Sequence, residues 1–178
     1  NSMIRGDRGS ANNNGMVFVN NTDYTIPAEL LQKLNNKIKQ ANDDLSFYVV
    51  DLNTYATIGY NIDREMNSAC VVKAAYCLYV FQQIEKGNGS LDEILTFESR
   101  HYYPSSGTIK NSPFGTQFTL REVLYRTINI SDNCGYYMLV DRFGRDGYNR
   151  WLDSLGVQYL HLLRPTSNWT SVCTRDLA

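Results

Sequence analysis

From Pro27 onward, hydrophobic residues repeat at the three-to-four-residue spacing of a helix, at Leu30, Leu31, Leu34 and Ile38. Pro27 and Glu29 suit the first turn, because proline has a helical φ and the positive end of the helix dipole favours an acid. Lys37 and Lys39 suit the last turn for the opposite electrostatic reason. The pattern predicts an amphipathic helix that begins at about Pro27.

Two runs rich in β-branched and aromatic residues follow, at residues 47–52 and 55–60. Asn53 and Thr54 separate them, and asparagine tolerates turn geometry. The runs predict an antiparallel hairpin at one side of a sheet. A lone hairpin is marginally stable in water, so we expect further strands or a covering helix to complete it. Beyond residue 61 the pattern predicts helices and loops, with no further strand pair.

The segment from Ala69 to Ile84 is apolar almost all round, which is typical of a helix buried in the core. Another helix is predicted over 119–130, because Thr119 and Glu122 have the spacing of a capping box. The apolar residues of this second helix share one face, at Leu120, Val123, Leu124 and Ile128.

Shorter helices are predicted over 136–143 and 148–155, each ended by a glycine. Residues 70–156 should therefore form a mostly helical lobe. Residues 1 to about 22 are rich in Asn, Gly and Ser and have no sustained apolar period, so we interpret 1–22 as a flexible linker. Residues 23–178 then form the folded domain.

Composition and charge narrow the function classes. With 178 residues, 43% of them hydrophobic and 20% charged, the chain suffices for one globular domain with a sizeable core. A net charge of −1 provides no electrostatic footprint for nucleic acid. No window holds the roughly 18 consecutive apolar residues of a membrane span. The chain opens without a signal segment, and a signal or anchor further upstream stays an open alternative.

Four cysteines are present, but they form no C-x-x-C pair and no Cys/His cluster with metal-ligand spacing; they are Cys70, Cys77, Cys134 and Cys173. We therefore expect no metal site and no cofactor. Each cysteine is interpreted as a small buried hydrophobe, which leaves the redox compartment open.

Lys73 is the only charged side chain between Glu65 and Glu85, and it lies near the start of the most apolar predicted helix. Burial disfavours the ammonium form, so a desolvated lysine suits a general base. Cys70 lies three residues earlier, on the same helix face, where the helix N-terminus favours a thiolate or a developing oxyanion. The alternative is that Lys73 reaches solvent and Cys70 fills the core.

A polar tripeptide, Ser131-Asp132-Asn133, stands between two predicted helices. Taken alone it is a turn, since these residue types favour turns. Together with Cys70-Val71-Val72-Lys73 it resembles the S-x-x-K and S-D-N motifs of class A β-lactamases and penicillin-binding proteins. The order of the motifs and their separation by about sixty residues also fit.

The resemblance covers roughly residues 27–178, and it implies a β-lactamase/transpeptidase-like α+β fold with a helical lobe and an antiparallel sheet. It implies that Cys70 is the acylated residue and Lys73 its base. Ser131 would relay a proton to the leaving nitrogen and Asn133 would bind the substrate's acyl side chain. The implied substrate is a β-lactam or a D-Ala-D-Ala-type peptide, and the implied location is extracellular or in the bacterial cell envelope.

The sequence departs from this family pattern at three places. Cysteine replaces the nucleophilic serine at residue 70, and the sequence leaves open whether it is natural or introduced. The loop expected to carry a deacylating glutamate, at about Leu163–Thr174, contains none. The K-T-G or K-S-G motif and its sheet strands are not found before Ala178, so the sheet should be incomplete in this chain.

These departures keep other interpretations open. One is a catalytically silent binding or sensor domain that retains the fold. Another is a fragment completed by a second piece of the same protein. A Cys-His dyad using His101 or His161 is a further alternative, although nothing in the sequence fixes either histidine near Cys70.

Overall fold

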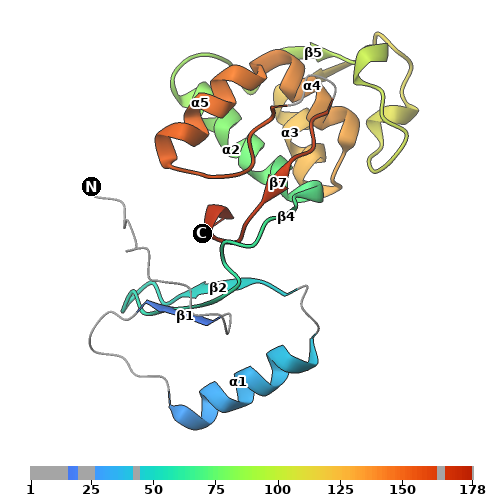
Figure 1. Cartoon of the computed structure of the whole chain (residues 1–178). Helices are drawn as coiled ribbons and strands as arrows, with labels where there is room; N and C mark the ends of the chain where they lie inside the picture. The colour runs from blue at the N-terminus through green and yellow to red at the C-terminus, as the bar shows by residue number, and fades with distance from the viewer. Residues whose placement is uncertain (1–15, 20–26, 42–44, 164–166, 178) are drawn as a thin grey trace. The chain divides into compact units, whose positions relative to one another are not determined.

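The predicted hairpin is present and has a third strand (Figure 1). The computed structural model describes residues 16–19, 27–41, 45–163 and 167–177. Strand β3 (Thr57–Tyr60) pairs antiparallel with β2 (Phe47–Val50) and with β1 (Met16–Val19), in the order β1-β3-β2. Met16 and Phe47 both lie opposite Tyr60. The hairpin thus finds the additional partner that a two-stranded ribbon needs.

Strand β1 lies inside the segment predicted as a linker, so this prediction is wrong for Met16–Val19. The four residues are too few to stand out as a strand in a polar segment. Residues 1–15 and 20–22 of the predicted linker lie outside the described residues. The β2–β3 turn is also longer than Asn53-Thr54: the Asp51 N–H donates to the Ala56 carbonyl (2.9 Å), and Tyr55 has φ +57°.

Helix α1 (Ala28–Gln40) begins directly after Pro27, as predicted. Glu29 in its first turn pairs with Lys33 at 2.7 Å. Of the predicted apolar face, Ile38 is buried and Leu30 is exposed. Contacts within the chain divide it into two compact units. The first consists of Asn1–Glu65 and Cys173–Ala178 and contains these strands and α1, and the second is Met66–Val172.

The second unit is the predicted helical lobe (Figure 1). A 3₁₀ turn, η1 (Ala69–Val71), leads into α2 (Val72–Glu85), which contacts three further helices. These are α3 (Leu120–Asn129), α4 (Asn133–Phe143) and α5 (Arg145–Leu155). Their shared core includes Val72, Tyr76, Leu120, Leu139 and Leu152.

Helix ends follow their predicted chemistry. The Thr119 hydroxyl caps α3 by accepting the Glu122 N–H at 3.2 Å. Gly144 and Gly156 follow α4 and α5 with φ of +75° and +74°, a region that glycine enters without steric cost. Helix α4 begins three residues before its predicted start, because Asp132 caps it.

Two short strand pairs were not predicted. Strand β5 (Ile94–Thr96) pairs with β6 (Gln117–Thr119), and β4 (Met66–Asn67) pairs with β7 (Ser171–Val172). Strands of two or three residues show too few alternations to be recognised from the sequence. The short turns η2 (Ser99–His101) and η3 (Ile109–Asn111) lie between β5 and β6.

Burial of the two main helices differs from prediction at specific positions. Helix α2 is not buried all round, because Val71 before it and Leu78 and Phe81 on it are 43%, 54% and 45% exposed. On α3, Ile128 is exposed and Thr127 is buried instead. The Thr127 hydroxyl donates to the Val123 carbonyl at 2.7 Å, which satisfies its polar group in the core.

Candidate active site

Lys73 lies in the first turn of α2 with only 2% of its surface exposed. Cys70, in the preceding 3₁₀ turn, is exposed, which contradicts its interpretation as a buried hydrophobe; Cys77, Cys134 and Cys173 are buried. The Lys73 Nζ lies 3.7 Å from the Cys70 Sγ. The predicted neighbours at i and i+3 are therefore in contact, and Lys73 does not reach solvent.

The Ser131-Asp132-Asn133 turn supplies the remaining partners of Lys73. Its ammonium group donates to the Ser131 hydroxyl at 2.9 Å and to the Ser131 carbonyl at 2.6 Å. It also donates to the Asn133 Oδ1. The structure thus brings Cys70, Lys73, Ser131 and Asn133 together, and the ammonium group has three oxygen acceptors besides the Cys70 sulfur.

Asp132 holds this turn in place and does not contact the ammonium directly. Its buried carboxylate accepts the backbone N–H groups of Thr108 (2.6 Å), Ile109 (2.9 Å) and Gly135 (3.0 Å). Gly107 packs so closely that an added Cβ would lie 2.2 Å from the Asp132 Cγ. Asp132 therefore joins the loop before η3 to the start of α4.

Burial lowers the pKa of Lys73 below its usual value. Three contributions raise the pKa of Lys73: the hydrogen bond to Cys70, and the electrostatic attraction of Cys70, Asp132 and Cys77 in their charged forms. They act against the effect of burial. Desolvation is the largest of these effects. The neutral amine needed for a base is therefore more accessible at this residue than at an ordinary lysine.

Two backbone positions in the site have positive φ without being glycine, namely Ala69 (+41°) and Ser131 (+55°). Such conformations are unfavourable for residues with a Cβ and persist where surrounding contacts impose them. The Ala69 N–H donates to the Asn67 Oδ1 at 2.8 Å, and the Ser131 carbonyl accepts from Lys73. Neither conformation was predictable from the residue types, since neither alanine nor serine favours it.

Trp169 is a site residue that the sequence did not single out. Its ring centroid lies 5.5 Å from the Lys73 Nζ, in the range of a cation–π contact. It belongs to the loop expected to carry a glutamate; the predicted Arg164-Pro165-Thr166 part of that loop lies outside the described residues. In the described remainder, Asn168 is buried and its Oδ1 accepts from Arg145 at 2.6 Å.

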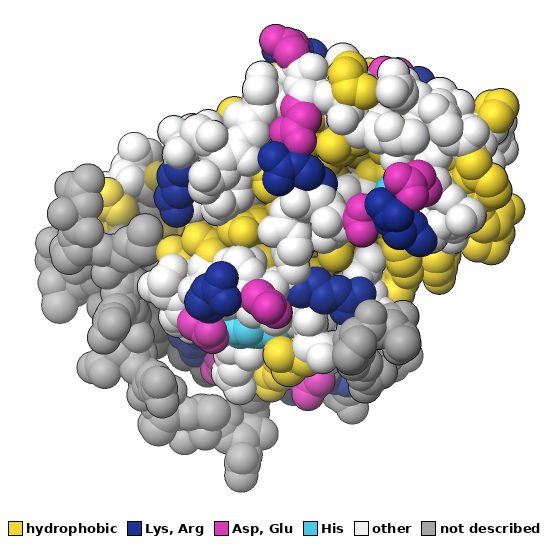
Figure 2. Space-filling view, turned by 90° about the horizontal axis from the view of Figure 1, so that it is seen from above, with side chains coloured by type: hydrophobic (Ala, Val, Ile, Leu, Met, Phe, Trp, Pro, Cys, Tyr) yellow, Lys and Arg dark blue, Asp and Glu magenta, His cyan; other side chains and the backbone are white. Residues whose placement is uncertain are grey.

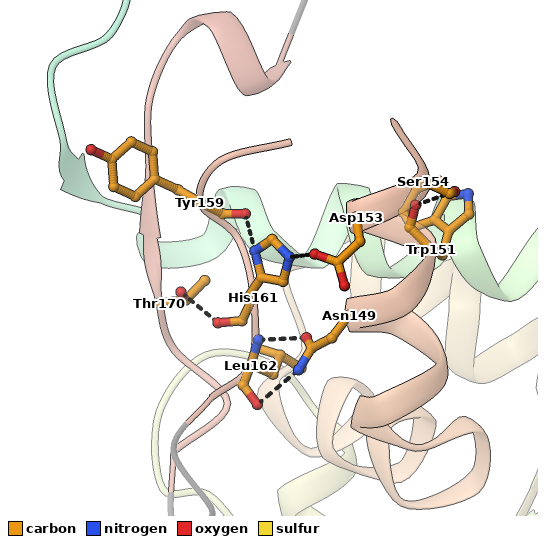
Figure 3. Close-up of polar contacts among 8 residues, drawn as sticks. All are labelled: Asn149, Trp151, Asp153, Ser154, Tyr159, His161, Leu162 and Thr170. Atoms are coloured by element: carbon orange, nitrogen blue, oxygen red, sulfur yellow. Dashed lines mark hydrogen bonds and ion pairs between the residues drawn. The ribbon is translucent and has the colours of Figure 1, made fainter. Parts of the chain in front are cut away.

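Neither histidine contacts Cys70. His161 Nε2 lies 3.0 Å from Asp153 Oδ1, and its Nδ1 lies 2.9 Å from the Tyr159 carbonyl, as Figure 3 shows. His101 is buried, its Nδ1 accepts the Glu98 N–H at 3.0 Å, and its Nε2 lies 3.3 Å from Asp141 Oδ2. Both rings have their contacts elsewhere, which argues against a Cys-His dyad.

The charged and metal-binding side chains of the described residues can be compared with this site. On the face seen in Figure 2, basic side chains are scattered among acidic ones and do not gather into a patch. Within the described residues, no group of three or more His, Cys, Asp or Glu could hold a metal ion. No helix in the described ranges is both long and apolar enough to cross a membrane.

Comparison with known proteins identifies the family. The beta-lactamase enzyme family matches residues 29–175. The chain belongs to this family. Among curated proteins, Beta-lactamase VEB-1 of Pseudomonas aeruginosa is 27% identical over 128 residues, which are 70% of this chain and 43% of VEB-1.

Solved structures show the fold of this β-lactamase family member. PBP-A has a TM-score of 0.74 at 24% identity, over 83% of this chain and 59% of PBP-A. A β-lactamase from Chitinophaga pinensis has a TM-score of 0.66 at 27% identity, over 74% of this chain and 50% of that protein. The fold is thus β-lactamase/transpeptidase-like, and the chain spans about half the length of these relatives.

Proposed function

We propose that this chain is the nucleophile-bearing part of an acyl-transfer enzyme that acts on β-lactams or D-Ala-D-Ala-type peptides through a covalent acyl-enzyme on residue 70. The observation that carries the proposal is the buried Lys73 ammonium, in contact with Cys70, Ser131 and Asn133 at once. A surface lysine would need no such set of acceptors. A buried lysine with a lowered pKa beside a nucleophile suits a general base.

In the proposed reaction, Lys73 takes the proton of residue 70, whose sulfur or oxygen attacks the amide carbonyl carbon. The C–N bond then breaks, and the leaving nitrogen takes a proton through Ser131, which lies 2.9 Å from the Lys73 Nζ. Residue 70 lies in the first helical turn, where backbone N–H groups lack partners within the helix and can stabilise the oxyanion.

Asn133 fits a substrate-binding role. Its Oδ1 accepts from Lys73, which directs the amide nitrogen to other acceptors. An acyl side chain with a carbonyl group would supply such an acceptor. The contact with Lys73 would also hold the Asn133 side chain in one orientation before substrate binds.

Deacylation should be weak. The described residues of the loop, 167–174, include no glutamate, and Trp169, which contacts Lys73 from this loop, has no carboxylate to activate water. A point mutant of PBP-A, solved as an acyl-enzyme complex with penicillin G, is similar to this chain at 23% identity and a TM-score of 0.77. That protein supports penicillins as probes for this chain. A location outside the cell or in the bacterial envelope, where such substrates occur, is part of the proposal.

The test is the intact mass after exposure to penicillin G, for the chain with Cys70 and for the Cys70→Ser variant. Because the chain spans only part of its relatives, both forms are also prepared in a version extended to the length of PBP-A. We expect an adduct on residue 70 that persists for many minutes. Its yield should be higher for the Cys70→Ser variant than for the chain with Cys70. The Lys73→Met variant should acylate about a hundredfold to ten-thousandfold more slowly.

The result also separates the alternatives. No adduct in any form would overturn acyl transfer and favour a silent binding or sensor domain, which the cysteine at residue 70 and the missing glutamate also suit. An adduct that turns over rapidly would show that another group activates water. An adduct only in the extended version would support acyl transfer that needs the rest of the fold.

A further inference from the structure

Trp169 has no part in the reaction proposed above, yet its ring lies over the group that the reaction depends on. The ring centroid is 5.5 Å from the Lys73 Nζ. The ring also packs against two tyrosine rings. Its centroid lies 5.7 Å from that of Tyr136 and 6.1 Å from that of Tyr103. The indole therefore contacts both an aromatic cluster and a buried cation.

The backbone on both sides of Trp169 is firmly held. On one side, Arg145 donates to the Ser167 carbonyl at 3.0 Å, and the Tyr136 hydroxyl donates to the Asn168 carbonyl at 2.9 Å. On the other side, the Ser68 N–H donates to the Thr170 carbonyl at 2.9 Å. Ser68 lies two residues before Cys70, so the segment that carries the ring is tied to the chain that carries the nucleophile.

The contact suits the electrostatics of Lys73. Its ammonium group already has acceptors on Cys70, Ser131 and Asn133. An aromatic face attracts a cation through its quadrupole and needs no proton, and tryptophan does so most strongly. The attraction is greatest where water is excluded, as it is around a side chain that is 2% exposed.

We propose that Trp169 is a positioning residue whose indole face holds the Lys73 ammonium beside residue 70 and favours its charged form. It sets the pH range over which Lys73 changes from cation to base. This inference rests on the proposed function for its catalytic consequence, but not for the contact itself. Among the described residues, the titratable groups that act on Lys73 are Cys70 from η1, Cys77 from α2 and Asp132 from the cap of α4, and Trp169 adds a group that does not titrate.

A test must weaken the contact without opening the site, because replacing the ring by a small side chain would also admit water and raise the pKa of Lys73. The chain contains two tryptophans, so a Trp151→Phe variant grown on fluorinated tryptophan carries the label at Trp169 alone. Fluorine withdraws charge from the ring face and leaves its shape nearly unchanged. The pKa of Lys73 is followed by NMR of its side-chain carbon and nitrogen.

We expect the pKa of Lys73 to fall stepwise with each added fluorine, by up to about one unit in total. The matched control is Trp169→Phe grown on the same tryptophans, in which only Trp151 is labelled. That ring packs against Tyr79 and Tyr148, so the pKa of Lys73 should not depend on its fluorination. An unchanged pKa in the Trp169 series, or an equal fall in the control series, would overturn the proposal.

The acylation rate of the Cys70→Ser variant by penicillin G provides the catalytic readout. This rate should increase with pH. As fluorine is added to Trp169, the increase should occur at lower pH, by the same amount as the fall in the pKa of Lys73. A pKa that responds to fluorine without any adduct would refute the proposed function and leave the positioning role intact. An adduct whose pH profile ignores fluorine would refute the positioning role and leave the proposed function intact.

Discussion

Lys73 links the electrostatics of the candidate site to the stability of the fold. Its ammonium is almost fully removed from water, so burial lowers its pKa in the folded chain below the usual value. Between the lowered folded value and the ordinary unfolded value near 10.5, the unfolded chain binds more protons. Within that window the free energy of unfolding must rise with pH on account of this residue.

We therefore predict that the chain gains stability relative to its Lys73→Met variant as pH rises through the lowered pKa of folded Lys73 toward the unfolded value near 10.5. Buried tyrosines and Cys77 act in the opposite direction, because burial raises their pKa values, that of Cys77 to about 12. The tyrosine contributions do not depend on Lys73 and cancel in the difference, whereas that of Cys77 cancels only in part, because the Lys73 charge lowers its pKa. Denaturant unfolding at a series of pH values measures the difference in free energy of unfolding between the two proteins. If this difference does not change with pH, Lys73 titrates normally in the folded chain.

The sequence signalled some of the site residues and not others. Lys73 was detectable because a single charge in an apolar helix must be either solvated or paired, and Ser131 and Asn133 were found by their motif. Trp169 gave no signal, since one aromatic residue in a polar loop has no periodic context. Its placement depends on Arg145, Tyr136 and Ser68, which are distant in the chain.

At the scale of elements, Asp132 does more than an ordinary N-cap. The Thr119 hydroxyl accepts one backbone N–H at the start of α3, whereas Asp132 accepts one from α4 and two from Thr108 and Ile109 at the start of η3. All three donors would be left without their acceptor if the carboxylate were removed. A buried donor without a partner costs about 1–3 kcal/mol.

We predict that Asp132→Ala lowers the free energy of unfolding by about 3 kcal/mol or more. Thr119→Ala is the matched control, with one cap bond lost and an expected cost of about 1 kcal/mol. Denaturant unfolding measures both. Equal losses for the two variants would indicate that water or another group satisfies the loop N–H groups.

The helices were largely predictable because their capping chemistry and spacing are local. Thr119, Gly144 and Gly156 mark their ends in the sequence as in the structure. Burial around each helix was less predictable: Leu78 and Phe81 are apolar and exposed on α2. Hydrophobicity shows that a face avoids water, but whether another element covers that face depends on the tertiary arrangement.

At the scale of the whole molecule, the last residues of the chain belong with its first part. The Arg175 N–H donates to the Ile62 carbonyl at 2.9 Å, and the Arg175 guanidinium pairs with both carboxylate oxygens of Asp63 at 2.5 and 2.9 Å. Ser46 and Thr174 share a hydrogen bond, and Cys173 is buried. This pairing across more than one hundred residues could not be predicted from local patterns.

The division into two units predicts an uneven response to truncation. Deleting residues 173–178 removes the contacts with Ser46, Ile62 and Asp63, while Met66–Val172 keep their own helical core. Amide hydrogen exchange should therefore speed up in β2 and β3 and stay nearly unchanged in α3 and α4, since local opening depends on the contacts of each unit. The control is Asp63→Ala, which loses a largely exposed ion pair worth about 0–1 kcal/mol. It should have a much smaller effect in β2 and β3 than the deletion. Equal acceleration in α3 and α4 on deletion would show instead that the chain opens as one cooperative unit.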